Sequence, residues 1–255
     1  MRLFIILLIL SIASGCSYFK TKEDKAKNWT VDRLYAEAKG AMESGYFSKA
    51  KKYFEFLETR FPFGVYGQQS LLDLAYVYYK TQDYDSSVSS CDRFIRLYPQ
   101  NPHVDYAYYL KGLVNFNRGR GFRVLPIDIS QRDTTYMHTS FQDFKKLVQH
   151  FPDSRYSADA RQRMVYLRNI LGRHEVNVAH YYMRRGAYVA AANRARFTIE
   201  NYPRTPAIPD ALTIMAKAYK VLGMNKLSRD ALRVLKENYP NYPGIERVEQ
   251  THVVN

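Results

Sequence analysis

The residue whose chemistry stands out first is Cys16, which ends an apolar N-terminal segment. Arg2 gives a short basic head, and the run from Leu3 to Ile12 is almost wholly apolar, which is typical of a signal peptide. That run is too short to span a bilayer. The small residues Ala13-Ser14-Gly15 precede the cysteine, as in bacterial lipoproteins, whose cysteine thiol is acylated before cleavage. We therefore predict a signal peptide over residues 1–15 and lipid on Cys16.

The neighbouring residues bear on where the lipid would sit. Ser17 stands where an aspartate would, by known sorting rules, retain a lipoprotein at the inner membrane, so we expect the outer membrane. Lipoproteins usually carry leucine at the position of Ala13, so an ordinary signal peptide or membrane anchor with an incidental cysteine stays the alternative. Acylation of Cys16 leaves only Cys91, which excludes an intramolecular disulfide and predicts a small buried residue there.

Other residues that could do chemistry are wrongly spaced for it. His174-Glu175 and His180 superficially resemble a zinc-binding helix, but the histidines are six residues apart rather than four and face different sides of a helix. Gly119-Arg120-Gly121 lacks the third glycine and the preceding strand of a nucleotide-binding loop. No serine or cysteine lies in a nucleophile elbow. The sequence therefore predicts no enzyme, no metal and no cofactor.

The formal charge of +14 favours acidic partners or surfaces. Nucleic acid is not the expected partner, because an exported chain does not meet it routinely and no binding motif accompanies the charge. We expect a solvated basic exterior that faces anionic components of the envelope. With 46% hydrophobic residues, the chain has enough apolar surface to bury a core.

Five aromatic-proline pairs divide the chain into similar units. They are Phe61-Pro62, Tyr98-Pro99, Phe151-Pro152, Tyr202-Pro203 and Tyr239-Pro240. A small residue stands twelve positions before each proline, followed at helical spacing by mostly apolar residues; the small residues are Ala50, Ser87, Ser140, Ala191 and Ser228. This pattern is typical of the second helix of a tetratricopeptide unit, in which the small residue lets two helices approach and the proline ends the helix.

First helices and turns follow the same period. Leu71, Leu74, Ala75 and Tyr78 have the expected first-helix spacing, as have Leu212, Met215, Ala216 and Tyr219. The turn position seventeen residues before the proline holds Gly45, Gln82, Gly186 and Gly223. Glycine tolerates the positive φ that such turns require. We therefore predict an all-α fold, a tetratricopeptide-like helical-repeat solenoid of about five helix pairs.

The two middle units hold additional chain, because successive prolines are 37, 53, 51 and 37 residues apart. In the 53-residue interval we predict an insertion near 117–139, a loop between the helices of the third unit. In the 51-residue interval, Ser157 to Leu171 predicts one further amphipathic helix, ended by Gly172. The expected organisation is a lipid tether over 16–29, N-terminal repeat units over 30–152, C-terminal units over 153–245 and a loose tail over 246–255.

Particular strings go beyond the generic repeat pattern and resemble the BamD family of outer-membrane assembly lipoproteins over nearly the whole mature chain. These strings are Arg60-Phe61-Pro62-Phe63-Gly64, Tyr66, Gln68-Gln69, Asp92-Arg93-Phe94-Ile95-Arg96-Leu97, Asp105-Tyr106, Lys111-Gly112-Leu113, Phe141-Gln142-Asp143-Phe144, Gly186-Ala187 and Asn193-Arg194. The chain departs from the family at Thr134, where a proline is usual after Ser130-Gln131-Arg132-Asp133, and in a longer basic tail.

The resemblance implies a part in the β-barrel assembly machinery at the periplasmic face of the outer membrane. The implied partners are the barrel-forming subunit, other lipoproteins of the complex and unfolded outer-membrane proteins. Without the resemblance, a tetratricopeptide lipoprotein that serves pilus assembly or cell-wall coordination is the competing interpretation, and a co-purified partner separates the two.

Two groups of residues are candidate binding sites. A stacked helix array presents a concave face, and its first junction offers Phe63, Tyr66 and Gln69 to client chains; alternatively Phe63 and Tyr66 simply cap that junction. In the C-terminal half, Arg194 lies at the edge of the helix seam and pairs either with a partner's carboxylate or within its own chain, for instance with Glu200 or Asp210. The resemblance associates Asn193-Arg194 with docking of the barrel-forming subunit.

Overall fold

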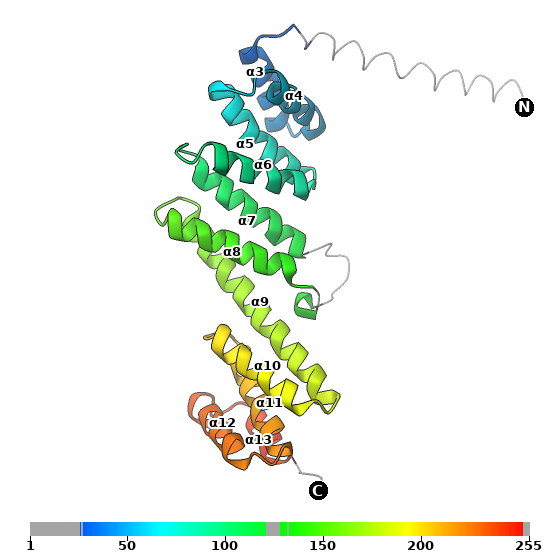
Figure 1. Cartoon of the computed structure of the whole chain (residues 1–255), viewed down its shortest axis with the longest axis vertical. Coiled ribbons are helices and arrows are strands. Elements are labelled where there is room, and N and C mark those ends of the chain that lie inside the picture. Colours follow the sequence, from blue (N-terminus) through cyan, green and yellow to red (C-terminus); the bar gives the residue numbers. More distant parts are fainter. Residues whose placement is uncertain (1–25, 27, 121–127, 132, 252–255) are drawn as a thin grey trace, which may run out of the picture. The chain divides into compact units, whose positions relative to one another are not determined.

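The computed structural model describes residue 26 and residues 28–120, 128–131 and 133–251. The predicted signal peptide, Cys16 and most of the predicted tether lie outside the described residues. Within them the fold is all-α, with eleven α-helices, one 3-10 turn and no strand (Figure 1). None of the helices in these ranges has the length and apolar character that a membrane span requires.

The chain divides into two compact units, residues 1–107 and 108–255, and the division falls inside one helix. The first unit contains α3 (Val31–Glu43), α4 (Phe47–Arg60), α5 (Gly64–Lys80) and α6 (Tyr84–Leu97), and α7 (Val104–Arg120) begins in it. The second contains the rest of α7, the 3-10 turn η1 (Ile129–Gln131), α8 (Thr135–His150), α9 (Ser157–Arg184), α10 (Tyr188–Asn201), α11 (Ile208–Val221), α12 (Asn225–Asn238) and α13 (Gly244–Glu249).

Helices pair in chain order, as a tetratricopeptide-like repeat requires. In the first unit α3 packs on α4, α4 on α5 and α5 on α6, and in the second α8 packs on α9, α9 on α10, α10 on α11 and α11 on α12. A bond from Ser140 of α8 to Gly112 of α7 joins the remaining two, so the described helices form five pairs, α3/α4 to α11/α12, with α13 added at the end. This confirms the predicted fold class.

The small residues predicted at the helix seams are all buried. Where the residue is serine, its hydroxyl donates to a backbone carbonyl of the paired helix. The bonds run from Ser87 to Ala75 (2.7 Å), from Ser140 to Gly112 (2.9 Å) and from Ser228 to Ala216 (2.9 Å). Both sides of each contact are small, so the two backbones approach closely.

The helix ends also follow the sequence. In each unit the aromatic before the proline is the C-cap, and its N–H donates to the carbonyl four residues earlier, as from Phe61 to Leu57 at 2.7 Å. The turn residues Gly45, Gln82, Gly186 and Gly223 all have positive φ, between 63° and 77°. At Gln82 the repeat imposes this backbone on a residue that rarely adopts it.

The prediction that Gly172 ends a helix was wrong. Helix α9 runs without a break from Ser157 to Arg184, through Gly172. A Cβ at Gly172 would lie 3.1 to 3.4 Å from Thr205, Tyr202 and Ala207, in the connection between α10 and α11. The glycine therefore serves close packing, and the surrounding helix tolerates its lower helix propensity.

Two further segments differ from the prediction: the insertion is shorter, and part of the tail is helical. The insertion lies between the helices of the third unit, as expected, but α7 extends to Arg120 and α8 begins at Thr135, so it is shorter than 117–139. The predicted loose tail from Glu246 overlaps the short helix α13, whose Val248 is buried against Ala216 and Ala231. Cys91 is buried, as predicted.

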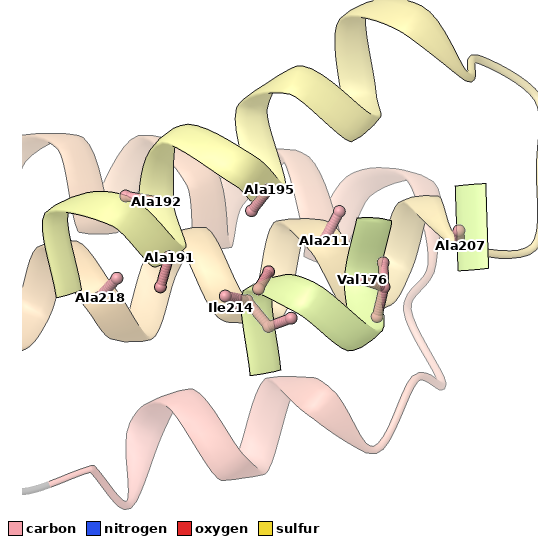
Figure 2. Packing of buried hydrophobic residues seen from close by; sticks show 9 residues of the cluster. Val176, Ala191, Ala192, Ala195, Ala207, Ala211, Ile214 and Ala218 are labelled. Atoms are coloured by element: carbon pink, nitrogen blue, oxygen red, sulfur yellow. The ribbon is translucent and has the colours of Figure 1, made fainter. Parts of the chain in front are cut away.

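The core between α9, α10 and α11 consists mainly of alanines, with one valine and one isoleucine (Figure 2). Short side chains let these three helices pack closely, which positions α10 and its Arg194 against α9. The buried members are Val176, Ala179, Ala191, Ala192, Ala195, Ala207, Ala211, Ile214 and Ala218.

Candidate functional site

The turn between α4 and α5 exposes two apolar side chains. Phe63, the N-cap of α5, is 85% exposed and Val65 is 79% exposed. Gly64 between them has a φ of +84°, a backbone that favours glycine. Phe61, two residues earlier, packs instead against the core of the first unit. Two exposed apolar side chains so close together can contribute to a surface that binds an apolar ligand.

Tyr66 and Gln69, predicted to act with Phe63, are partly exposed and contact other residues of the chain. The Tyr66 ring lies 5.1 Å from that of Tyr35 on α3, and its hydrogen bond to Asp32 raises the pKa of the Tyr66 hydroxyl. The Gln69 amide donates to Asp73 Oδ1 at 3.2 Å. Tyr66 thus contacts α3 at the α3/α5 junction, whereas Phe63 is exposed.

Asp73 is the centre of the polar network in this junction. Its buried carboxylate accepts bonds from the Tyr35 hydroxyl (3.0 Å) and from Lys39 Nζ (3.1 Å), besides that from Gln69. Burial, and then the charge of Asp73, raise the pKa of Tyr35. Because the donors already satisfy the carboxylate, this network holds α3 against α5 and offers a ligand little.

In the C-terminal units, Arg194 pairs with a residue that the sequence did not suggest. Its Nη1 donates to Glu175 Oε2 on α9 at 2.8 Å, and neither Glu200 nor Asp210 is its partner. Asp210 is bound instead by Arg173 at 3.1 Å and by the Tyr242 hydroxyl. The signal available in the sequence was the position of Glu175, four residues before the seam residue Ala179 and so on the same helix face.

The Arg194–Glu175 pair lies half inside the protein. The Glu175 side chain is 9% exposed and the Arg194 side chain 38%, so the carboxylate is buried while the guanidinium reaches the surface. Glu175 also interacts with His138 of α8 and with Tyr202. Burial lowers the pKa of His138, and the charge of Glu175 opposes this shift. Burial raises the pKa of Tyr202, and the charge of Glu175 raises it further.

Around Arg194 the outer face of α10 carries apolar groups. The guanidinium lies 5.9 Å from the ring of Phe197. Val189, Asn193 and Phe197 follow at four-residue spacing and are all exposed, and the Asn193 amide oxygen accepts a bond from Arg196 (3.0 Å). A cation with spare donors beside exposed apolar side chains can bind a protein surface that carries a carboxylate.

Two of the residues that suggested a metal site, His174 and Glu175, have other partners. His174 Nδ1 donates to the carbonyl of Ser130 at 2.8 Å, and Glu175 binds Arg194. Burial lowers the pKa of His180. Among the residues with described positions, no group of three histidine, cysteine, aspartate or glutamate side chains could hold a metal ion.

Comparison with known proteins identifies relatives along most of the chain. A family model described as an outer membrane lipoprotein, YfiO, matches residues 27–235. The outer membrane protein assembly factor BamD of Neisseria meningitidis serogroup B is 44% identical over 250 residues, which cover 95% of this chain and 94% of that protein. BamD of Xylella fastidiosa is 38% identical over 246 residues, which cover 96% of this chain and 84% of that protein.

Among solved structures, the tetratricopeptide domain of P58(IPK) matches 91% of this chain and 66% of that chain, with a TM-score of 0.44 and 12% identity. Because the TM-score and the identity are both low, the fold assignment rests on the helices of this chain and their pairing.

The Arg194–Glu175 pair generates a stability prediction. Arg194→Leu leaves the buried Glu175 carboxylate without its cation, which should lower the free energy of unfolding by roughly 1–3 kcal/mol and the melting temperature by several degrees. The double variant Arg194→Leu, Glu175→Leu removes both charges and should recover most of that loss. Thermal unfolding followed by circular dichroism measures both. A single variant as stable as the unmodified protein would show that the pair contributes nothing to the fold.

Proposed function

Because this chain belongs to the YfiO family of outer membrane lipoproteins, we propose that it is a non-catalytic scaffold of the machinery that assembles β-barrel proteins in the outer membrane. The observation that carries this function is the 44% identity along 95% of the chain with a relative named as an outer membrane protein assembly factor. The competing interpretation, a scaffold for pilus assembly or cell-wall coordination, is not favoured by these relatives.

The proposed address is the periplasmic face of the outer membrane, with a lipid on Cys16 as the anchor. The family description as outer membrane lipoproteins supports an anchor of this kind. A single acyl chain binds a membrane only marginally, so stable anchoring needs the several chains that a mature lipoprotein terminus carries.

The proposed contact with unfolded outer-membrane clients centres on Phe63, with Val65 beside it. Both side chains project into solvent. The residues on either side of them are packed: Phe61 lies against the core of the first unit, and Tyr66 lies against Tyr35. A rigid turn that presents an aromatic side chain loses little conformational entropy when a client covers it. Tyr66 and Gln69 then support the turn rather than contact the client first.

The proposed contact with the barrel-forming subunit centres on Asn193 and Arg194. Within the described part of the chain, the Arg194 head makes one hydrogen bond, from Nη1 to Glu175. Arginine has five donors in a planar fork, so the remaining donors can bind a carboxylate of the partner. Phe197 and Val189 provide apolar surface on either side of these residues along α10.

Cys16→Ala should release the protein from the membrane into the periplasmic fraction, since the acyl chains are the only membrane attachment that we propose. The measurement is fractionation of cells depleted of the barrel-forming subunit, because binding to that subunit could otherwise hold the variant at the membrane. Cys91→Ala, which changes a buried cysteine, should stay with the outer membrane. Membrane association of the Cys16 variant under these conditions would refute the lipid anchor.

Phe63→Ser should weaken the binding of unfolded outer-membrane proteins about tenfold or more, because a buried phenylalanine contributes roughly 1.5–3 kcal/mol. Fluorescence anisotropy with a labelled unfolded client gives the affinity. Tyr46→Ser is the matched control, since Tyr46 is also a turn aromatic of the first unit and is 68% exposed. Equal losses for both variants would indicate nonspecific binding, and crosslinks confined to the C-terminal half would place the client site elsewhere.

Arg194→Lys should reduce recovery of the barrel-forming subunit at least tenfold while changing the melting temperature little. Lysine still offers a cation to Glu175 but lacks the planar fork that binds two acceptors at once, and truncating such a pair at an interface costs about 2–5 kcal/mol. Arg173→Lys is the control, because Arg173 pairs with Asp210 in a similar half-buried geometry (3.1 Å). Full recovery of the subunit with Arg194→Lys would exclude this residue from the interface.

A further inference from the structure

The positive charge of the chain is concentrated in its second unit. Residues 108–255 contain 24 lysines and arginines against 12 aspartates and glutamates, whereas residues 1–107 contain 14 against 12. Between Val176 and Ile199, four arginines occur without a single carboxylate. A surface of one sign attracts ligands of the other, so an anionic partner is expected to contact this unit.

One ion pair fixes the register between α9 and α11. Both helices pack against α10 through short connections, so both are antiparallel to it and run in the same direction. Arg173 of α9 binds Asp210 of α11 at 3.1 Å. Seven residues further along each helix, about two turns, His180 follows Arg173 and Lys217 follows Asp210. Lys217 therefore lies beside a histidine rather than a carboxylate, and Arg184 comes one turn beyond His180 on the same face of α9.

Helix α13 brings a third cation to α11. Gly244 lies so close to Thr213 that a Cβ would not fit between them, and Val248 packs against Ala216. These two contacts place α13 along the C-terminal half of α11. Arg247, about one turn beyond Gly244 and exposed, therefore lies beside that half of α11.

The electrostatic surroundings of His180 agree with this placement. Burial lowers the pKa of His180, and the charge of Asp210 opposes this shift. The positive charges of Arg184, Arg247 and Lys217 lower the same pKa further, so cations from three helices act on one side chain.

Within the described part of the chain, these cations are not balanced by carboxylates. The carboxylate of Asp210 is already bound by an arginine and a tyrosine of the chain. Arg184 and Lys217 form no ion pair with a described residue, and Arg247 donates to the carbonyl of Pro243 at 3.4 Å. Like charges gathered without a counter-ion repel one another, and an anionic ligand would remove that repulsion.

The spacing of the cations favours a ligand with several carboxylates. Neighbouring helices pack with their axes about 8–10 Å apart, and the three cations stand on three helices. A compact anion would have to draw their long side chains together, which costs conformational entropy. In an extended segment, alternate side chains point to the same side about 7 Å apart, so successive acidic residues match the cations without that cost.

We propose that Arg184, Lys217 and Arg247 form a binding site for an extended acidic segment of a partner protein. The site lies on α9, α11 and α13. It goes beyond the proposed scaffold function and does not depend on the docking surface proposed on α10. Because it consists of charged side chains on helices, it selects its ligand by the spacing of carboxylates more than by the identity of other residues.

Binding of a labelled oligoglutamate peptide to the full chain, measured by fluorescence anisotropy, tests the site. Arg184→Gln combined with Lys217→Gln should weaken binding about fivefold or more, because each ion pair near the surface contributes up to about fivefold. Lys226→Gln combined with Arg229→Gln removes the same charge from exposed side chains of α12 and should weaken binding less than about twofold. Equal losses in the two double variants would show attraction by net charge alone and would overturn the site.

Thermal unfolding separates a binding role from a structural one. Without peptide, the Arg184→Gln, Lys217→Gln variant should melt at the same temperature as the unmodified chain or higher, because it loses mutual repulsion. A marked fall would show that these cations stabilise the fold and would overturn the inference. Oligoglutamate should raise the melting temperature of the unmodified chain and of the α12 control more than that of the site variant.

Two further measurements identify the class of ligand and separate the proposals. Inorganic phosphate and phosphatidylglycerol vesicles, at equal concentration of negative charge, should bind more weakly than the peptide; tighter binding of either one would overturn the acidic segment in favour of a phosphate group. Arg194→Lys should bind the peptide as the unmodified chain does, even though docking of the barrel-forming subunit is expected to fail in that variant. Loss of peptide binding in Arg194→Lys would overturn a separate site.

Discussion

The fold depends on one contact that recurs in every unit, a small residue on the second helix against a small residue on the first. The two positions are twelve residues apart in Ala75/Ser87 and Ala216/Ser228, where the serine hydroxyl donates to the facing carbonyl. The same offset relates Ala38 to Ala50 and Ala179 to Ala191, all fully buried. In the third unit the offset from Gly112 to Ser140 is twenty-eight, yet the bond is the same (2.9 Å). The insertion therefore lengthens the connection without altering the seam.

With the backbones fixed at the seam, the joints between helices are completed by polar groups as well as apolar ones. Among the described residues, four tyrosine hydroxyls each donate to a carboxylate that also pairs with a cation. These groups are Tyr35–Asp73–Lys39, Tyr78–Glu55–Lys51, Tyr109–Asp159–Arg163 and Tyr242–Asp210–Arg173. Burial, together with the acceptor, raises the pKa of Tyr109 and of Tyr242 to about 12. These hydroxyls stay protonated and can keep donating, which accounts for part of the high tyrosine content of the chain.

Features that depend on local spacing along the chain were predictable from the sequence, whereas contacts that depend on how two helices face each other were not. Seam residues, positive-φ turns and helix ends follow from intervals counted back from each proline, so they were predicted correctly. Gly172 was misinterpreted because a glycine that ends a helix and one that admits a neighbouring segment look alike in a single sequence. At the first junction Tyr66 is packed and Phe63 is exposed, and in the second unit Arg194 pairs with Glu175. Both arrangements depend on the rotation of one helix against another. Local periodicity does not determine that rotation.

The two proposed binding surfaces differ in how closely they are tied to the fold. Phe63 lies in an exposed turn, so its replacement should leave the repeat intact, and client affinity at the proposed surface could vary independently of stability. Arg194 binds Glu175 in the interior, and in the proposed docking its other donors would serve the exterior. An arginine can do both because its five donors are fixed in one plane, whereas a lysine that reached Glu175 would direct its single charge inward. The proposed docking at α10 thus depends on the packed helices, and any change that disturbs the α9/α10 joint would reach the proposed interface as well.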